Sequence, residues 1–406
     1  MSGRGILSDL RIVEASAFVA APLGGLTLAQ MGADVIRIDP LGGGLDFNRW
    51  PLSDGDVSLF WCGLNKSKRS VALNLADPEG REIAMSLITA PGDGAGLFVT
   101  NFPPRGWLDY DKLKARRADL IQLTLQGDHK GGSSVDYTVN ARVGIPYVTG
   151  SVTDEAPVNH VLPAWDVATG HLVATGLLAA ERHRCRTGQG QHVKLALEDV
   201  ALSVMGHLGF IAEAQLGCAR GRYGNDLFGA FGRDFACADG RRVIAIGLTP
   251  KQWTSLVEAT GLAEVIEAIG ARLRLDLGRE GDRFLARREL GAEIGGWIAA
   301  RSFGEVAASF DRAGVCWAPY QTVDELVRSD PACSVENPLF DIVAQSGIGR
   351  VLSPRSAIRF DAFDARPAGT APVLGEHTEA VLGEILGIDG AAYGRLHDRG
   401  IVHNPR

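Results

Sequence analysis

The alternation of two apolar patterns between residues 11 and 126 constrains the fold more than any other feature of the sequence. Short apolar runs of strand type are separated by segments whose apolar residues recur at helical spacing. The predicted strands are 11–14, 34–39, 70–75, 96–101 and 120–125, and the predicted helices between them are 22–31, 77–90 and 110–117. Strands that alternate with helices are typical of a mainly parallel sheet covered on both faces. Ligands of such sheets bind beyond the carboxyl ends of the strands.

The later part of the sequence divides the chain into a larger and a smaller folding unit. A long alanine-rich helix is expected at 166–186, followed by a strand at 191–197 and a helix at 198–216, whereas 126–165 is expected to be irregular. Glycines break the pattern at 217–232, as is common between domains. We predict an α/β fold with a large domain built on a Rossmann-like, mainly parallel sheet (1–200), a linker (201–230), a smaller α+β domain (231–330) and a return to the large domain (331–406).

Composition excludes several classes of function. A net charge of -7 argues against a broad nucleic-acid or anionic-membrane surface, which would need a basic face. The six cysteines are scattered singly and the nine histidines never pair around an acid at helical spacing, so we expect no metal and reduced thiols. Without a signal peptide or an apolar run of about 18 residues, the chain is expected to be cytoplasmic.

Basic loops fall at the expected ligand edge of the sheet. They are NKSKRS at 65–70, NFPPR at 101–105, and Arg49 with Trp50 after a glycine-rich loop. Such clusters are usually solvated surface, but their position favours an anionic ligand. The turn before the first predicted helix carries Gly24 and Gly25 without a dinucleotide fingerprint. These glycines fit phosphate binding at a helix start and close packing equally well.

One acidic residue, Asp166, lies in the segment HVLPAWDVATGH (160–171), between a proline turn and a helix start. From this pattern alone Asp166 is most simply a helix N-cap. A serine hydrolase is excluded because the chain has no G-x-S-x-G motif.

Several collinear segments resemble class III CoA-transferases. They are 10–39, NKSKRSVALNL (65–75), DPEGRE (77–82), VTNFPPRG (99–106), 165–197, 314–326 and 374–386. The resemblance implies that Asp166 is a nucleophile that forms an aspartyl-CoA thioester, with CoA entering only as part of the substrate. Within the family, SAFVAAPLGG, NHVLPAWD, HLGFIAEA, FGAFGRDF and CWAPY resemble the branch that moves CoA between the two ends of one short dicarboxylic acid. The expected partners are an acyl-CoA and a second copy of the chain, in an interlocked homodimer.

The resemblance also assigns binding residues by position. The expected CoA-binding residues are Val19, Ala20, Lys68, Asn101, Phe102 and, less directly, Arg105. The candidates for holding the free substrate carboxylate are Arg49, His160 and Arg233. Backbone N–H groups of the loop 227–232 are expected to stabilise the oxyanion. Pro40 stands where some relatives have a basic residue, and the short FGAFGRDF stretch, in place of the long poly-glycine loop of formyl-CoA transferases, argues against formyl transfer.

Three alternatives stay open at this point. The strongest is intermolecular transfer from an acyl-CoA such as succinyl-CoA to a free dicarboxylate. A racemase of the same fold would need a histidine ahead of the aspartate segment, where this chain reads SSVDYTVN. A CoA-binding protein without activity is disfavoured because Asp166 stands in its motif.

Overall fold

A computed structural model describes residues 5–153, 155–363 and 366–403 of the chain and divides it into two units. The first unit comprises Met1–Val143, Val161–Ala212 and Pro331–Arg406, and the second comprises Gly144–His160 and Glu213–Asp330. The segment 144–160, which the sequence placed in the large domain, therefore clusters with the smaller unit. The two units are described separately.

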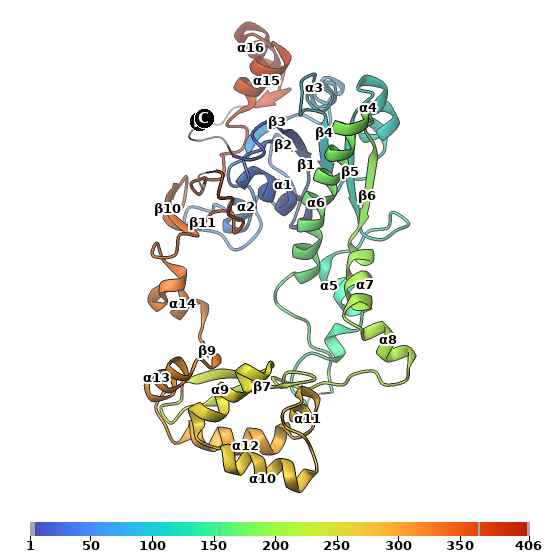
Figure 1. Ribbon diagram of the computed structural model, residues 1–406. Helices are drawn as coiled ribbons and strands as arrows, with labels where there is room; N and C mark the ends of the chain where they lie inside the picture. Colours follow the sequence, from blue (N-terminus) through green and yellow to red (C-terminus); the bar gives the residue numbers. More distant parts are fainter. Residues whose placement is uncertain (1–4, 154, 364–365, 404–406) are drawn as a thin grey trace. The chain divides into compact units, whose positions relative to one another are not determined.

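The first unit is built on a seven-stranded sheet of described residues in the order β12-β3-β2-β1-β4-β5-β6 (Figure 1). Its strands are β1 Arg11–Ala15, β2 Asp34–Pro40, β3 Arg69–Leu73, β4 Leu97–Thr100, β5 Ile121–Gln126, β6 His192–Ala196 and β12 Val402–His403. All neighbours are parallel except β12, which pairs antiparallel with β3. The predicted mixed α/β fold with a mainly parallel sheet is confirmed.

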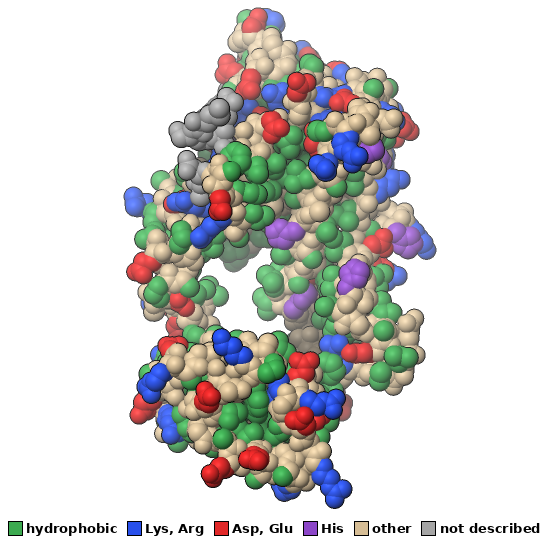
Figure 2. All heavy atoms as spheres, viewed as in Figure 1, with side chains coloured by type: hydrophobic (Ala, Val, Ile, Leu, Met, Phe, Trp, Pro, Cys, Tyr) green, Lys and Arg blue, Asp and Glu red, His purple; other side chains and the backbone are tan. Residues whose placement is uncertain are grey.

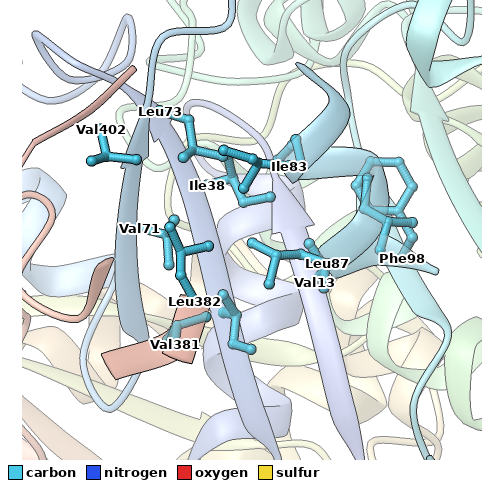
Figure 3. Close-up of a cluster of buried hydrophobic side chains, with 14 of the residues drawn as sticks. Val13, Ile38, Val71, Leu73, Ile83, Leu87, Phe98, Val381, Leu382 and Val402 are labelled. Atoms are coloured by element: carbon cyan, nitrogen blue, oxygen red, sulfur yellow. The ribbon is translucent and has the colours of Figure 1, made fainter. Parts of the chain in front are cut away.

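Helices cover both faces of this sheet because successive strand residues point to opposite sides. In the first unit they are α1 Ala20–Gln30, α2 Leu59–Leu64, α3 Pro78–Ile88, α4 Tyr110–Arg116, α5 Asp136–Arg142, α6 Ala164–Thr187, α7 Leu197–His207, α15 Thr378–Leu386 and α16 Gly390–Asp398; α8 Phe210–Gln215 follows α7 across the boundary. One core cluster joins strand residues such as Val13, Ile38 and Phe98 to α3 and α15 (Figure 3). A second cluster joins residues such as Ile12 and Val35 to α1 and α6.

The remaining elements of the first unit come from its C-terminal part. The strands β10 Phe340–Gln345 and β11 Gly349–Pro354 form an antiparallel hairpin. Short 3-10 turns occur at Gly106–Leu108 and Pro331–Cys333. No helix among the described residues is both long and apolar enough to cross a membrane. Figure 2 shows Lys and Arg side chains interspersed with Asp and Glu on the face in view.

The second unit is a smaller α+β structure around an antiparallel sheet in the order β7-β8-β9. Its elements are β7 Phe231–Ala236, β8 Arg242–Gly247, α9 Pro250–Thr260, α10 Ala263–Leu273, α11 Glu280–Leu285, α12 Arg287–Ala299, α13 Phe303–Ala313, β9 Cys316–Tyr320 and α14 Val323–Ser329, with a 3-10 turn at Ile145–Tyr147. Capping boxes start α9 at Thr249 and α13 at Ser302. Helices α11 and α12 are separated at Ala286.

Candidate active site

A cavity of about 660 Å³ lies in the first unit, beyond the carboxyl ends of β1, β4 and β5. Strands β1 and β4 are neighbours in the sheet. From β1 the chain continues to β2 on one side, and from β4 it continues to β5 on the other side, so the strand order reverses between β1 and β4. Ligands of open α/β sheets bind at such a switch point. The described lining residues are 17–20, Arg49, Trp50, Phe60, 101–104, 125–127, 131–137, Pro163, Asp166 and Leu197.

The turn between β1 and α1 forms one wall of the cavity and is held from two sides. The side-chain amide of Asn101 donates to the carbonyl oxygen of Ala17 at 2.8 Å and accepts from its N–H at 3.0 Å. The next N–H, that of Phe18, donates to Asp46 at 3.0 Å. Phe18 has a φ of 68°, which is uncommon for a bulky residue. These hydrogen bonds keep the turn in a conformation that the chain would not adopt alone.

Buried charges below this turn form a network that supports it. The Lys68 ammonium lies 2.9 Å from Glu14 and 2.8 Å from the carbonyl oxygen of Pro22. The Arg37 guanidinium binds Glu14, Asp39 and Asp46 at 3.3, 2.9 and 3.2 Å. Burial lowers the pKa of Lys68 to about 8, although Glu14 opposes this shift. Burial also lowers the pKa of Arg37, but the three carboxylates have the larger effect, so the pKa of Arg37 is raised.

The glycines of α1 serve close packing in this structure. A methyl group on Gly25 would collide with the Glu14 carboxylate that binds Lys68. On the neighbouring helix, a methyl group on Gly170 would lie 2.9 Å from the carbonyl oxygen of Ala20. Gly170 therefore lets α6 approach α1 closely (Figure 1). This contact brings the first turn of α6 to the cavity wall formed by the β1–α1 turn.

Removal of the Lys68 charge should destabilise the first unit strongly. We expect Lys68→Met to lower the free energy of unfolding by about 3–5 kcal/mol, because it leaves Glu14 buried without its nearest cation. The double variant Glu14→Gln/Lys68→Met should recover part of this loss. Urea unfolding followed by circular dichroism measures both. The exposed Lys112→Met on α4 serves as control and should change stability by less than about 0.5 kcal/mol; an equally small effect at Lys68 would contradict the argument.

Asp166 lies in the first turn of α6 and faces the cavity. The helix begins at Ala164, and its N-cap residue is Pro163, whose side chain makes no capping hydrogen bond. The interpretation of Asp166 as the N-cap was therefore wrong by three residues. The proline turn starts the helix early enough to place Asp166 inside it.

The cap of α6 comes instead from Asp136, 30 residues earlier in the chain. The buried Asp136 carboxylate accepts from the N–H of Trp165 at 2.8 Å and from the N–H of Asp166 at 3.1 Å. One turn further along α5, Asn140 accepts from the indole N–H of Trp165 at 3.1 Å. Helix α5, in a stretch expected to be irregular, thus fixes both the backbone and a large side chain at the start of α6. No local pattern in the sequence indicates Asp136, because it stands in a helix of 7 residues, too short to show periodicity.

The ionisation of Asp166 is perturbed by its surroundings. Burial raises the pKa of Asp166 to about 7, repulsion from Asp136 adds to the shift, and Arg49 opposes it. A carboxylate with an ordinary pKa is almost fully ionised at neutral pH. The raised pKa leaves Asp166 partly protonated at neutral pH.

Arg49 supplies positive charge at this cavity. Its guanidinium lies over the ring of Phe60 at 5.1 Å and over the ring of Phe18 at 5.9 Å. Among the described lining residues it is the one lysine or arginine. Aromatic faces attract a guanidinium and orient it, so Arg49 is placed to bind an anion in the cavity.

The structure brings together some of the residues expected from sequence. Val19, Ala20, Asn101, Phe102 and Arg49 line the cavity with Asp166, whereas Lys68 and Arg105 do not. Lys68 is fully buried and Arg105 is exposed just beyond the loop after β4. His160, Arg233 and the loop 227–232 belong to the second unit. Arg233 lies 3.5 Å from Asp226. Within the described ranges no group of His, Cys, Asp or Glu side chains could hold a metal ion.

Comparison with known proteins identifies the family. The model for CoA-transferase family III matches residues 7–378. The chain belongs to this family. It is 57% identical over 99% of both chains to 2-methylfumaryl-CoA isomerase of Chloroflexus aurantiacus. It is 31% identical to succinyl-CoA:mesaconate CoA-transferase of Haloarcula marismortui, over 95% of this chain and 97% of that one.

Solved structures of other proteins share the fold. A CAIB/BAIF family protein from Brucella suis superposes with a TM-score of 0.76 and 24% identity, over 94% of this chain and 100% of that one. The mixed α/β architecture is therefore common to proteins that differ in three quarters of their aligned residues.

Proposed function

We propose that this member of CoA-transferase family III moves CoA from C1 to C4 of 2-methylfumaryl-CoA (mesaconyl-CoA), giving 3-methylfumaryl-CoA. The observation that carries the proposal is that Asp166 and Arg49 line the same cavity and interact electrostatically, a nucleophile near a cation. The 57% identity to an enzyme named for this reaction supports the choice of substrate. A diacid bound as its CoA ester keeps one free carboxylate, which Arg49 can bind.

The proposed reaction uses Asp166 twice and needs no other reactant. The Asp166 carboxylate attacks the C1 thioester carbonyl, breaking the C–S bond and forming a mixed anhydride and CoA thiolate. The thiolate attacks the aspartyl carbonyl, which releases mesaconate and leaves an aspartyl-CoA thioester. The C4 carboxylate of mesaconate attacks this thioester and frees the thiolate again. The thiolate then attacks the C4 carbonyl, forming the product and restoring the carboxylate.

Each attack creates an oxyanion that needs hydrogen-bond donors. The loop 131–134 lines the cavity with Asp166, and its Gly131 and Gly132 N–H groups already donate to Asp128, so we assign the donor role to the backbone N–H groups of Ser133 and Ser134. The hydrogen bonds from Gly132 and Lys130 to Asp128, both 2.8 Å, give this loop a defined shape. The loop 227–232, expected earlier to supply the donors, lies in the second unit.

CoA is proposed to lie along the wall formed by Val19, Ala20, Asn101 and Phe102. These residues follow the ends of two adjacent strands, where a parallel sheet presents ligands. Arg105 is exposed nearby in sequence and suits a phosphate. We propose that Lys68 acts below the turn, because its ammonium is already bound by Glu14 and Pro22.

Two further properties are proposals from the family resemblance. The chain is proposed to form an interlocked homodimer. It is also proposed to work in the cytoplasm, which fits six cysteines that are all free in the structure.

Labelled mesaconate distinguishes this function from its closest alternative. The similarity to succinyl-CoA:mesaconate CoA-transferase favours intermolecular transfer as the second candidate. We expect mesaconyl-C1-CoA to be converted to mesaconyl-C4-CoA with less than about 1% incorporation of ¹³C from free mesaconate, measured by mass spectrometry. Succinyl-CoA with labelled mesaconate is the control reaction and should give little product. Label in most of the CoA ester would show intermolecular transfer and overturn the proposal.

A further inference from the structure

We infer that Asp136 is a positioning residue for this reaction, which fixes the first turn of α6 and favours loss of negative charge from Asp166. Only the expected effect of Asp136 on turnover rests on the proposed function. Its physical basis is the contact between two acids that the fold places at one helix start. One binds backbone N–H groups, and the other faces the cavity.

The geometry gives Asp136 the place that a capping residue normally takes. Two N–H groups of the first turn of α6 donate to one of its carboxylate oxygens. These donors carry the positive end of the helix dipole, which would otherwise stabilise an anion at Asp166. Asp136 is 1% exposed, so its charge acts on Asp166 through protein rather than through water.

Few other charges act on Asp166. Arg49, from the loop after β2, is the opposing charge. Helix α1, which packs against α6, carries no charged side chain between Ala20 and Gln30. On α7, Glu198 forms an ion pair with Arg142 of α5 at 3.1 Å. The balance at Asp166 is therefore set mainly by burial, Asp136 and Arg49, which together hold its pKa near 7.

Charge repulsion between the two acids changes during the reaction. When Asp166 becomes an anhydride, its negative charge passes to the CoA thiolate, and when that thiolate forms the aspartyl-CoA thioester, the charge passes to the released C1 carboxylate of mesaconate. The repulsion from Asp136 ends at that step, while Arg49 can bind the new carboxylate. Asp136 therefore raises the energy of the free carboxylate relative to the covalent states. This effect shifts the enzyme towards the aspartyl-CoA thioester, the state in which mesaconate must turn around.

Asp136→Asn tests the charge while keeping an oxygen that can accept from both N–H groups. We expect the pH at which half of Asp166 is protonated to fall by about one unit. Infrared difference spectroscopy measures this in the free enzyme, with the Asp166 band assigned by its absence in Asp166→Asn. The acidic limb of kcat/KM should move by the same amount, and the plateau kcat should fall about tenfold as the thioester becomes less favoured.

Matched variants separate charge from structure. Trp165→Phe removes the hydrogen bond to Asn140 without changing charge and should leave the Asp166 midpoint in place, whereas Arg49→Gln should raise it. Asp136→Ser, a second neutral variant, replaces Asp136→Asn if the latter does not fold. An unchanged midpoint in the neutral variants, or an equal shift in Trp165→Phe, would overturn the inference. The infrared titration needs no substrate, so it stands even if mesaconyl-CoA proves not to be the substrate.

Discussion

Replacement of Asp166 by asparagine is expected to reduce the rate of mesaconyl-CoA isomerisation by at least about 10⁴-fold, because an amide cannot attack a thioester and leave again as a carboxylate. The loss should appear in kcat and in kcat/KM alike, since the nucleophile takes part in every covalent step. Substrate binding should change little, because the amide occupies the same position in the first turn of α6.

Trapping of the covalent state measures the role of Asp166 directly. Wild-type protein mixed with mesaconyl-C1-CoA and borohydride should carry a reduced aspartyl group on the peptide that contains Asp166, detected by mass spectrometry. Asp199, in the first turn of α7 and exposed, offers a matched control. Asp199→Asn should retain the wild-type rate and the trapped adduct. An adduct on another peptide, or more than about a tenth of the activity in Asp166→Asn, would contradict the assignment.

The same substitution should stabilise the protein in a pH-dependent way. The pKa of Asp166 is higher in the folded protein than in the unfolded chain, so the folded state binds more protons between about pH 4 and pH 7. Wild-type stability therefore falls as the pH rises through this window. The amide of Asp166→Asn has no proton to lose, so this loss of stability is absent in the variant. Asp166→Asn should therefore be more stable than the wild type by about 1–2 kcal/mol at pH 8 and equally stable at pH 4. Thermal unfolding at the two pH values measures the difference.

The strands and helices of the first unit could be predicted where their apolar period is long. The strands β1 to β5 are buried on both faces, so their apolar runs indicate them without reference to the rest of the fold. The strand β12 has two residues, and α5 has seven. Such short elements form only because distant residues pair with them, and a local pattern cannot indicate them.

In the candidate site, only residues whose role shows in their own local segment could be predicted from the sequence. Asp166 stands in a recognisable segment beside a proline turn, so its place at a helix start is visible in the sequence. Asp136 acts through a contact with Asp166 across 30 residues, which only the fold creates. Lys68 lies in a run of basic residues like those of exposed loops, yet Glu14 from another strand holds it fully buried. Sequence pattern alone cannot distinguish a buried charge pair from a solvated one.

The retention of mesaconate during its turn should depend on Arg49. The intramolecular reaction passes through a state in which CoA is bound to Asp166 and mesaconate is held without a covalent bond. Arg49, oriented by Phe18 and Phe60, is the cation available at the described cavity wall to hold a carboxylate in this state. We expect Arg49→Gln to lower kcat/KM for mesaconyl-C1-CoA about 10²-fold, because a charge-assisted hydrogen bond to the free carboxylate is lost.

A second effect of Arg49→Gln separates retention from simple binding. Weaker retention lets mesaconate leave the aspartyl-CoA enzyme, so labelled mesaconate from solution should enter the product several times more often per turnover than in the wild type. Arg116→Gln removes an arginine of the same type from the surface pair with Glu82 and should change neither the rate nor the labelling. If Arg49→Gln lowered the rate without increasing incorporation, Arg49 would contribute to binding or to the transition state alone. Mesaconate would then be confined by the shape of the cavity rather than by charge.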